Sequence, residues 1–355
     1  MPFQHSHSDP RDHSDPRDHS DPRDHSDPRD PRDGRRARTD GPDRTDGPER
    51  AVPRERRGGR HALADGRHEF GQNFLVDRGV VEKVVRLVAA TSGPVVEIGP
   101  GDGALTLPMR RLGRSLTAVE LDGVRARELR RRAGPGVTVV EGDFLRHRLP
   151  SSPFVLVGNV PFDRTTALLR RVLHADHWTD AVLLVQWEVA RRRAGVGGAT
   201  MMTAQWWPWY DFALVARVPA GAFHPRPGVD GGLLLVERRR EPLVPASERV
   251  RYQGLVHAVF TGRGRGVRQI VRGACPSLSS AGAAAWARRH RLGDRDLPRT
   301  LSAPAWADLH RITSPGSGAA PPRAVGGRAA GTSAQVRRAA RGGGARGGDR
   351  GDRRR

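Results

Sequence analysis

Short apolar runs alternate with amphipathic stretches over the middle of the chain, from about residue 60 to residue 313. Valine and leucine recur at helical spacing in VVEKVVRLVAA, which predicts a helix over 80–90. Apolar runs of strand length follow, most of them leading into a segment of helical pattern: PVVEIGPGDGALTLPM (94–109), SLTAVELD (115–122), VTVVEGDF (137–144), FVLVGNVPF (154–162), AVLLVQWEVARRR (181–193) and DFALVARV (211–218). Strands that alternate with helices form parallel sheets with helical crossovers. The pattern therefore predicts an α/β fold with a doubly wound, mostly parallel sheet.

The pattern changes after this region. LLLVERR (233–239) follows a proline-rich loop without an intervening helix, so we expect one antiparallel strand at the edge of the sheet. Residues 246–313 have helical character, and Trp286, Leu297, Leu301 and Trp306 are available for a small core. We therefore predict two domains, an α/β domain over 61–240 and a small helical domain over 241–313.

Both ends of the chain have compositions that cannot build a core. Four copies of HSDPRD occupy 7–30, and a proline in each copy excludes a helix, so 1–60 is predicted to be a disordered tail. Residues 314–355 are mostly Gly, Ala, Pro and Arg and are also predicted to be disordered. Gly-Arg tails bind RNA phosphates without sequence preference, although a solvated tail with no role explains this segment equally well.

The overall charge points to a polyanionic partner. The chain has 61 Lys+Arg against 39 Asp+Glu, a net charge of +22, which favours nucleic acid first and an anionic membrane second. Lys83 is the only lysine, and this choice of arginine reflects a GC-rich genome rather than a partner.

The sequence also limits the compartment of the protein. Cys275 is the only cysteine, so no internal disulfide can form. No signal-peptide core and no apolar run of membrane-spanning length occurs. We expect a cytoplasmic monomer with no membrane contact and no metal site.

A glycine turn after the first predicted sheet strand indicates a nucleotide-like ligand. Gly99 and Gly101 follow Glu97 in VVEIGPGDGAL, and Glu120 ends the next strand, where a carboxylate can accept both ribose hydroxyls of an adenosine group. NAD, FAD and S-adenosylmethionine all carry that group. Glu97 would repel a pyrophosphate but suits an α-ammonium, so we favour S-adenosylmethionine. Asp143, at the end of the third strand, can accept from the adenine amino group.

The fourth predicted strand of the sheet ends in Asn159, Val160, Pro161 and Phe162. The exocyclic nitrogen of an adenine is a poor nucleophile because its lone pair is conjugated into the ring. The Asn159 side-chain oxygen and the Val160 carbonyl, turned outward by the following proline, can accept its two N–H bonds and free that lone pair. Phe162 can stack on the purine, and no general base is needed.

Six sequence blocks in this order and spacing resemble the rRNA adenine N6-methyltransferases: GQNFLVD (71–77), EIGPGDGALT (97–106), Glu120, GDFL (142–145), GNVPF (158–162) and FHPRPGV (223–229). The resemblance covers about 70–240 strongly and 241–313 loosely. It implies a Rossmann-like class I methyltransferase sheet. It also implies that Asn73 and Leu75 close over S-adenosylmethionine and that Gly99, Glu120, Asp143 and Asn159 line it. Phe223 would cover the face of the target adenine opposite Phe162. The base must then leave its stack.

The composition resembles one branch of that family, the erythromycin-resistance methylases of antibiotic-producing actinomycetes. This resemblance implies N6-methylation of one adenine in the peptidyl-transferase region of 23S rRNA and resistance to macrolides, lincosamides and streptogramin B. One departure is Phe162, where many members have tyrosine.

Other functions remain as alternatives. Within the family, the rival is the housekeeping 16S rRNA dimethyladenosine transferase. A non-catalytic RNA-binding factor would keep the basic surface but has no need of the carboxylates at 97, 120 and 143. A DNA adenine methylase usually has two prolines where Val160 and Pro161 stand, and a dehydrogenase lacks a hydride site here.

Overall fold

The computed structural model describes residues 73–314. The two predicted tails lie outside these residues except for Ser314, as do the first two residues of the GQNFLVD block.

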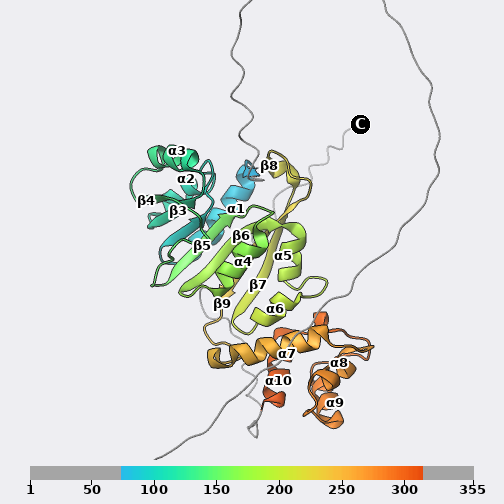
Figure 1. The fold of residues 1–355 in the computed structure, drawn as a ribbon. Coiled ribbons are helices and arrows are strands. Elements are labelled where there is room, and N and C mark those ends of the chain that lie inside the picture. The colour runs from blue at the N-terminus through green and yellow to red at the C-terminus, as the bar shows by residue number, and fades with distance from the viewer. Residues whose placement is uncertain (1–72, 315–355) are drawn as a thin grey trace, which may run out of the picture. The chain divides into compact units, whose positions relative to one another are not determined.

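A seven-stranded sheet forms the centre of the described structure (Figure 1), with the strand order β4-β3-β2-β5-β6-β9-β7. Neighbouring strands from β4 to β6 run parallel, whereas β9 is antiparallel to both β6 and β7. The strands are β2 (Val95–Ile98), β3 (Leu116–Glu120), β4 (Val137–Glu141), β5 (Phe154–Asn159), β6 (Trp178–Gln186), β7 (Tyr210–Val218) and β9 (Gly231–Arg238). The prediction of a mostly parallel, doubly wound sheet is confirmed.

The predicted antiparallel strand is present, but its expected place at the sheet edge is wrong. Strand β9 lies between β6 and β7, and β7 forms the edge. Seven of the eight residues of β9 are buried, as a strand with two partners requires. Strand β7 is half-buried over most of its length, which fits an edge position.

Helices cover both faces of the sheet because successive strand residues point to opposite sides. Val96, Ile98 and Leu156 join a core with α4, while Val95 and Val157 join a second core with α1 and α3. The helices that flank the sheet strands are α1 (Arg78–Ala89), α2 (Thr106–Met109), α3 (Gly123–Ala133), α4 (Thr165–His174), α5 (Trp187–Arg193) and α6 (Met201–Trp206).

Four further helices follow the sheet: α7 (Arg249–Thr261), α8 (Val267–Ala274), α9 (Ser280–Arg289) and α10 (Ala303–Thr313). Trp286, Trp306 and Leu301 are buried among them, as predicted, and Leu297 is partly buried. The Tyr252 hydroxyl of α7 donates to the Ala204 carbonyl of α6 at 2.7 Å. The predicted domain boundary near residue 240 stays a prediction.

A small ribbon, which the hydrophobic pattern does not reveal, joins two distant parts of the chain. Strand β1 (Phe74–Leu75) pairs antiparallel with β8 (Phe223–His224). The Val76 N–H extends the pairing by donating to the Ala222 carbonyl at 2.8 Å. This ribbon brings the GQNFLVD and FHPRPGV blocks together.

Candidate functional site

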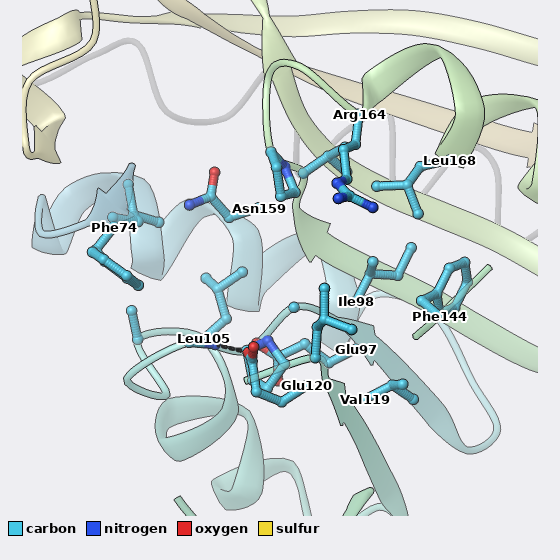
Figure 2. A pocket seen from close by; sticks show the side chains of 18 of the residues that line it. Phe74, Glu97, Ile98, Leu105, Val119, Glu120, Phe144, Asn159, Arg164 and Leu168 are labelled. Carbon is cyan, nitrogen blue, oxygen red and sulfur yellow. Dashed lines mark hydrogen bonds between the residues drawn. The ribbon is translucent and has the colours of Figure 1, made fainter. Parts of the chain in front are cut away.

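A cavity of about 220 Å³ lies at the carboxyl ends of the parallel strands. Strand β2 pairs with β3 on one side and with β5 on the other, so the order of the strands along the chain reverses its direction across the sheet at β2. Ligands of open α/β sheets bind at such a switch point. Figure 2 shows Glu97 and Glu120 at one side of this cavity and Asn159 and Arg164 at the opposite side.

Eleven of the twelve residues predicted for the site line this cavity. They are Asn73, Leu75, Glu97, Gly99, Gly101, Glu120, Asp143, Asn159, Val160, Pro161 and Phe162. Phe223 is the exception among the described residues. Several further lining residues were not predicted, among them Phe74, Phe144, Leu145, Arg164 and Leu168. Two of these, Phe144 and Leu145, directly follow Asp143 in the GDFL block, which is a signal that could have identified them.

The glycine turn adopts a backbone that needs glycine. Gly101 has φ 54° and Gly103 has φ 83°, both in the left-handed region. A Cβ on Gly103 would lie 2.6 Å from the Leu129 side chain of α3, and one on Gly101 would lie 3.0 Å from the Phe74 ring. The glycines therefore let a helix and an aromatic ring pack closely against the turn.

The Glu120 carboxylate fixes this turn from the end of β3. Its Oε2 accepts the Gly101 N–H at 2.8 Å and its Oε1 accepts the Asp122 N–H at 2.9 Å, and the side chain is buried. Each carboxylate oxygen has two lone pairs, so one on each oxygen stays available for a ligand hydroxyl.

Glu97 is a buried acid at the end of β2. The Thr106 hydroxyl donates to its Oε2 at 2.6 Å. Burial is the main cause that raises the pKa of Glu97 to about 8; the Thr106 hydrogen bond opposes this rise and the charge of Glu120 adds to it. Without a ligand the acid is therefore mostly protonated at neutral pH, and a cation beside it would favour the carboxylate.

This raised pKa makes cofactor binding proton-linked if the α-ammonium of S-adenosylmethionine lies beside Glu97. At pH 6.5 the free protein holds a proton on Glu97, whereas the complex holds a carboxylate against an ammonium that keeps its own proton below pH about 7.7. Binding at pH 6.5 should then release nearly one proton, and affinity should rise about fivefold from pH 6.5 to pH 7.5, because the free ammonium begins to lose its own proton over the same range. Calorimetry in two buffers of different ionisation enthalpy measures the proton.

Glu97→Gln is the matched control for this prediction, because it keeps the shape and the charge of the protonated acid. Proton release should fall to near zero in this variant. Wild-type protein that binds the cofactor without releasing a proton would contradict the ammonium assignment.

Asp143 lies in the turn after β4, where its Oδ1 accepts the Leu145 N–H at 2.9 Å. This hydrogen bond fixes the position of the carboxylate in the wall of the cavity. Phe144, next to it, is buried and adds an apolar surface to the same wall. The pairing of a fixed carboxylate with apolar side chains suits a purine with an amino group at its edge.

The Asn159 amide is oriented by the first residue of the described chain. Its Nδ2 donates to the Asn73 carbonyl at 2.7 Å, which leaves its Oδ1 as the acceptor. The Val160 N–H is used by the Leu184 carbonyl of β6 at 2.9 Å. Within the described residues no donor contacts the Val160 carbonyl. Two acceptors therefore stand at the exit of β5.

Phe162 and Phe223 contact each other, but not as the parallel walls of a sandwich. Their ring centroids are 5.9 Å apart and their planes meet at 73°, an edge-to-face arrangement. Phe223, the first residue of β8, is buried, and its ring packs against Gly231. The role of Phe223 as the second cover of an adenine stays a prediction.

Two other features of the described part of the chain bear on function. None of its helices has the length and apolar character to cross a membrane. Its histidine, cysteine and acidic side chains form no group of three or more that could hold a metal ion.

Comparison with known proteins identifies relatives over the same region. A model of the family described as ribosomal RNA adenine dimethylase matches residues 64–309. An rRNA adenine N-6-methyltransferase of Corynebacterium diphtheriae is 56% identical over 212 residues, 59% of this chain and 84% of the relative. The mycinamicin-resistance protein MyrB of Micromonospora griseorubida is 50% identical over 261 residues, 71% of this chain and 83% of the relative.

A solved structure is also similar to this chain. The crystal structure of the 23S rRNA methyltransferase ErmE superposes with a TM-score of 0.62 at 29% identity, covering 67% of this chain and 98% of ErmE.

Proposed function

Since the chain belongs to the ribosomal RNA adenine dimethylase family, we propose that it methylates N6 of one adenine in 23S rRNA with S-adenosylmethionine as donor. The observation that carries the proposal is that one and the same cavity is lined by the glycine turn, by the two buried glutamates and by the Asn-Val-Pro-Phe residues. Two relatives support it, one named an rRNA adenine N-6-methyltransferase and the other a mycinamicin-resistance protein. Modification of the peptidyl-transferase region blocks macrolide, lincosamide and streptogramin B binding, so the protein confers resistance.

The residues of the cavity fit S-adenosylmethionine better than a dinucleotide. Glu97 and Glu120 lie together at the glycine turn (Figure 2), where the Glu120 carboxylate would repel a pyrophosphate and a cation would favour the carboxylate form of Glu97. Glu120 holds the ribose hydroxyls, Glu97 faces the α-ammonium and Asp143 accepts from the adenine amino group. When bound, the cofactor supplies a methyl group on a sulfonium, which is a strong electrophile.

The chain's own contribution to catalysis is to hold the target amine. The Asn159 Oδ1 and the Val160 carbonyl accept its two N–H bonds and draw the nitrogen toward a tetrahedral form. Because the Asn159 Nδ2 is already used by the Asn73 carbonyl, the amide cannot turn its donor toward the substrate. Phe162, half-buried at the cavity wall, stacks on the purine. Positioning and local electrostatics then suffice for the transfer, and the methylated nitrogen gives up one proton to water.

The proposal is tested by mapping methylated adenines in cells with and without the gene. Mass spectrometry of nuclease fragments of 23S and 16S rRNA should find new methyl groups on one 23S adenine, together with a raised inhibitory concentration of a macrolide. Cells that express the Asn159→Ala variant are the control and should resemble cells without the gene. New methyl groups in 16S rRNA alone would favour the housekeeping alternative, and no methylation would contradict the proposal.

The helical region supplies a candidate contact for the rRNA backbone. Residues 249–314 contain twelve arginines and three acidic residues, more net positive charge than the longer described segment before them. Arg265, Arg268 and Arg272 line one hollow between α8 and α9. Arg268 pairs with Asp294 there, which leaves the other two without a carboxylate partner among the described residues.

Removing two of these charges should weaken rRNA binding in a salt-dependent way. For Arg265→Ala/Arg272→Ala, the slope of log affinity against log salt should fall by about 0.7–0.9 per lost phosphate contact. Filter binding of a 23S fragment at several salt concentrations measures it. The matched control is Arg127→Ala/Arg131→Ala on the exposed face of α3, which removes equal charge. If the control variant lowers the salt dependence of rRNA affinity by the same amount, the effect comes from net charge alone.

Compartment and assembly follow from this function only as proposals. Because the substrate is ribosomal RNA, we place the action of the protein in the cytoplasm. We expect a monomer, since the cavity is built from one chain.

A further inference from the structure

The chain segment that borders the cavity, residues 73–77, is held firmly on one side. Leu75 pairs with Phe223, and the Val76 N–H donates to the Ala222 carbonyl. The Asn73 carbonyl accepts from Asn159. All of these contacts lie on the side of β8 and β5, and none of them reaches the glycine turn across the cavity.

Phe74 makes the connection to the glycine turn. Its ring lines the cavity (Figure 2) and packs so closely on Gly101 that a Cβ there would lie 3.0 Å from it. The guanidinium carbon of Arg125 lies 4.2 Å from the centroid of the same ring, within cation–π range. The ring is therefore held between the turn backbone and an arginine.

Arg125 is itself fixed by two carboxylates. Its Nη1 contacts Asp102, which belongs to the glycine turn, and its Nε lies 3.6 Å from Asp122, the residue that caps α3. The Arg125 side chain is 19% exposed, whereas Asp102 is 63% exposed. An ion pair that exposed contributes little alone, so its main effect here is to aim the guanidinium at the ring.

We propose that Arg125 is a positioning residue that holds Phe74 across the glycine turn and so slows the release of the cofactor. The inference depends on the proposed function, because it assumes that S-adenosylmethionine occupies the cavity. Arg125 does not contact the reacting atoms. It acts through Phe74, which closes the border of the cavity between the 73–77 segment and the turn.

The test measures the rate at which radiolabelled S-adenosylmethionine leaves the full-length protein after addition of an unlabelled excess. Arg125→Met keeps the aliphatic stem but removes the charge, and release should become about five- to tenfold faster. Arg125→Lys should restore part of the difference, because an ammonium also binds an aromatic face. Phe74→Leu should accelerate release as well, and the double variant should add little to either single change.

The control is Arg127→Met, a change of the same kind on the exposed face of the same helix. Its release rate should equal that of the wild type. Melting temperature and affinity for a 23S fragment should be unchanged in the Arg125 and Arg127 variants, which separates positioning from a folding role. If Arg125→Met misfolds, Phe74→Leu and Arg125→Lys probe the same contact.

Two results would overturn the proposal in distinguishable ways. Release within twofold of the wild type in both Arg125→Met and Phe74→Leu would exclude the positioning role while leaving the methyltransferase function standing. If the wild-type protein does not bind S-adenosylmethionine at all, both the positioning role and the proposed methyltransferase function are excluded.

Discussion

Asn159→Ala is expected to lower the rate of methyl transfer about 10³-fold, the size of effect found when one preorganised polar group is removed from an active site. The alanine removes the side-chain acceptor at the exit of β5 and leaves only the Val160 carbonyl for the amine. Affinity for the rRNA should be nearly unchanged, because the surface around the cavity keeps its charge. Single-turnover transfer of a labelled methyl group to a 23S fragment measures the rate, and filter binding measures the affinity.

Asn159→Asp separates the acceptor from the orientation of the amide. It keeps an oxygen toward the substrate, but its other oxygen would face the Asn73 carbonyl, which now accepts a hydrogen bond at 2.7 Å. Two facing acceptors repel, so the carboxylate should turn away and transfer should be intermediate between the wild type and Asn159→Ala. Turnover within tenfold of the wild type in Asn159→Ala would contradict the mechanism.

The central part of the fold could be predicted because its signal is local. Strands β2, β3, β5 and β6 are mostly buried apolar runs, and β4 at the sheet edge keeps an apolar pattern with one buried residue. Each of these strands is followed by a turn or a helix pattern that the chain must place on one face of the sheet. Parallel strands bring their carboxyl ends to one edge. Polar residues at those ends, such as Glu97, Glu120 and Asn159, therefore line one cavity even though they are far apart in sequence.

The order of the last strands could not be predicted in the same way. Strand β9 is apolar whether it lies at an edge or inside, and its position depends on β7, which precedes it and pairs outside it. That choice follows from the path of the connecting loops. Hydrophobic periodicity does not encode this path.

Hydrophobic periodicity could not predict the border of the cavity, although the family resemblance placed Asn73 and Leu75 there. Strands β1 and β8 have two residues each, too short for any periodicity. The Phe74–Arg125 contact joins a strand to a helix start that is far along the chain. An arginine in GVRARELRRRA reads as one of many in a basic helix, and only the structure separates the one that lies over a ring from its exposed neighbours.

Glu120→Ala is expected to weaken S-adenosylmethionine binding about 100-fold. The change removes the acceptor for the ribose hydroxyls and also leaves the Gly101 and Asp122 N–H groups without their present partner, so the turn loses its fixed shape. An unsatisfied buried donor costs about 1–3 kcal/mol, so these losses together account for an effect of that size.

Glu120→Gln should weaken binding less than alanine does, because its amide oxygen can hold one of the two backbone N–H groups while its NH₂ group opposes the other. Titration calorimetry with S-adenosylhomocysteine, at a temperature well below the melting transition of each variant, measures the affinity apart from any loss of stability. If affinity decreases in the order wild type, Glu120→Gln, Glu120→Ala, the carboxylate supports cofactor binding in two ways, by direct contact and by fixing the shape of the glycine turn. Equal affinity in all three proteins would mean that the ribose binds elsewhere. The cofactor would then not lie opposite Asn159, as the proposed mechanism requires.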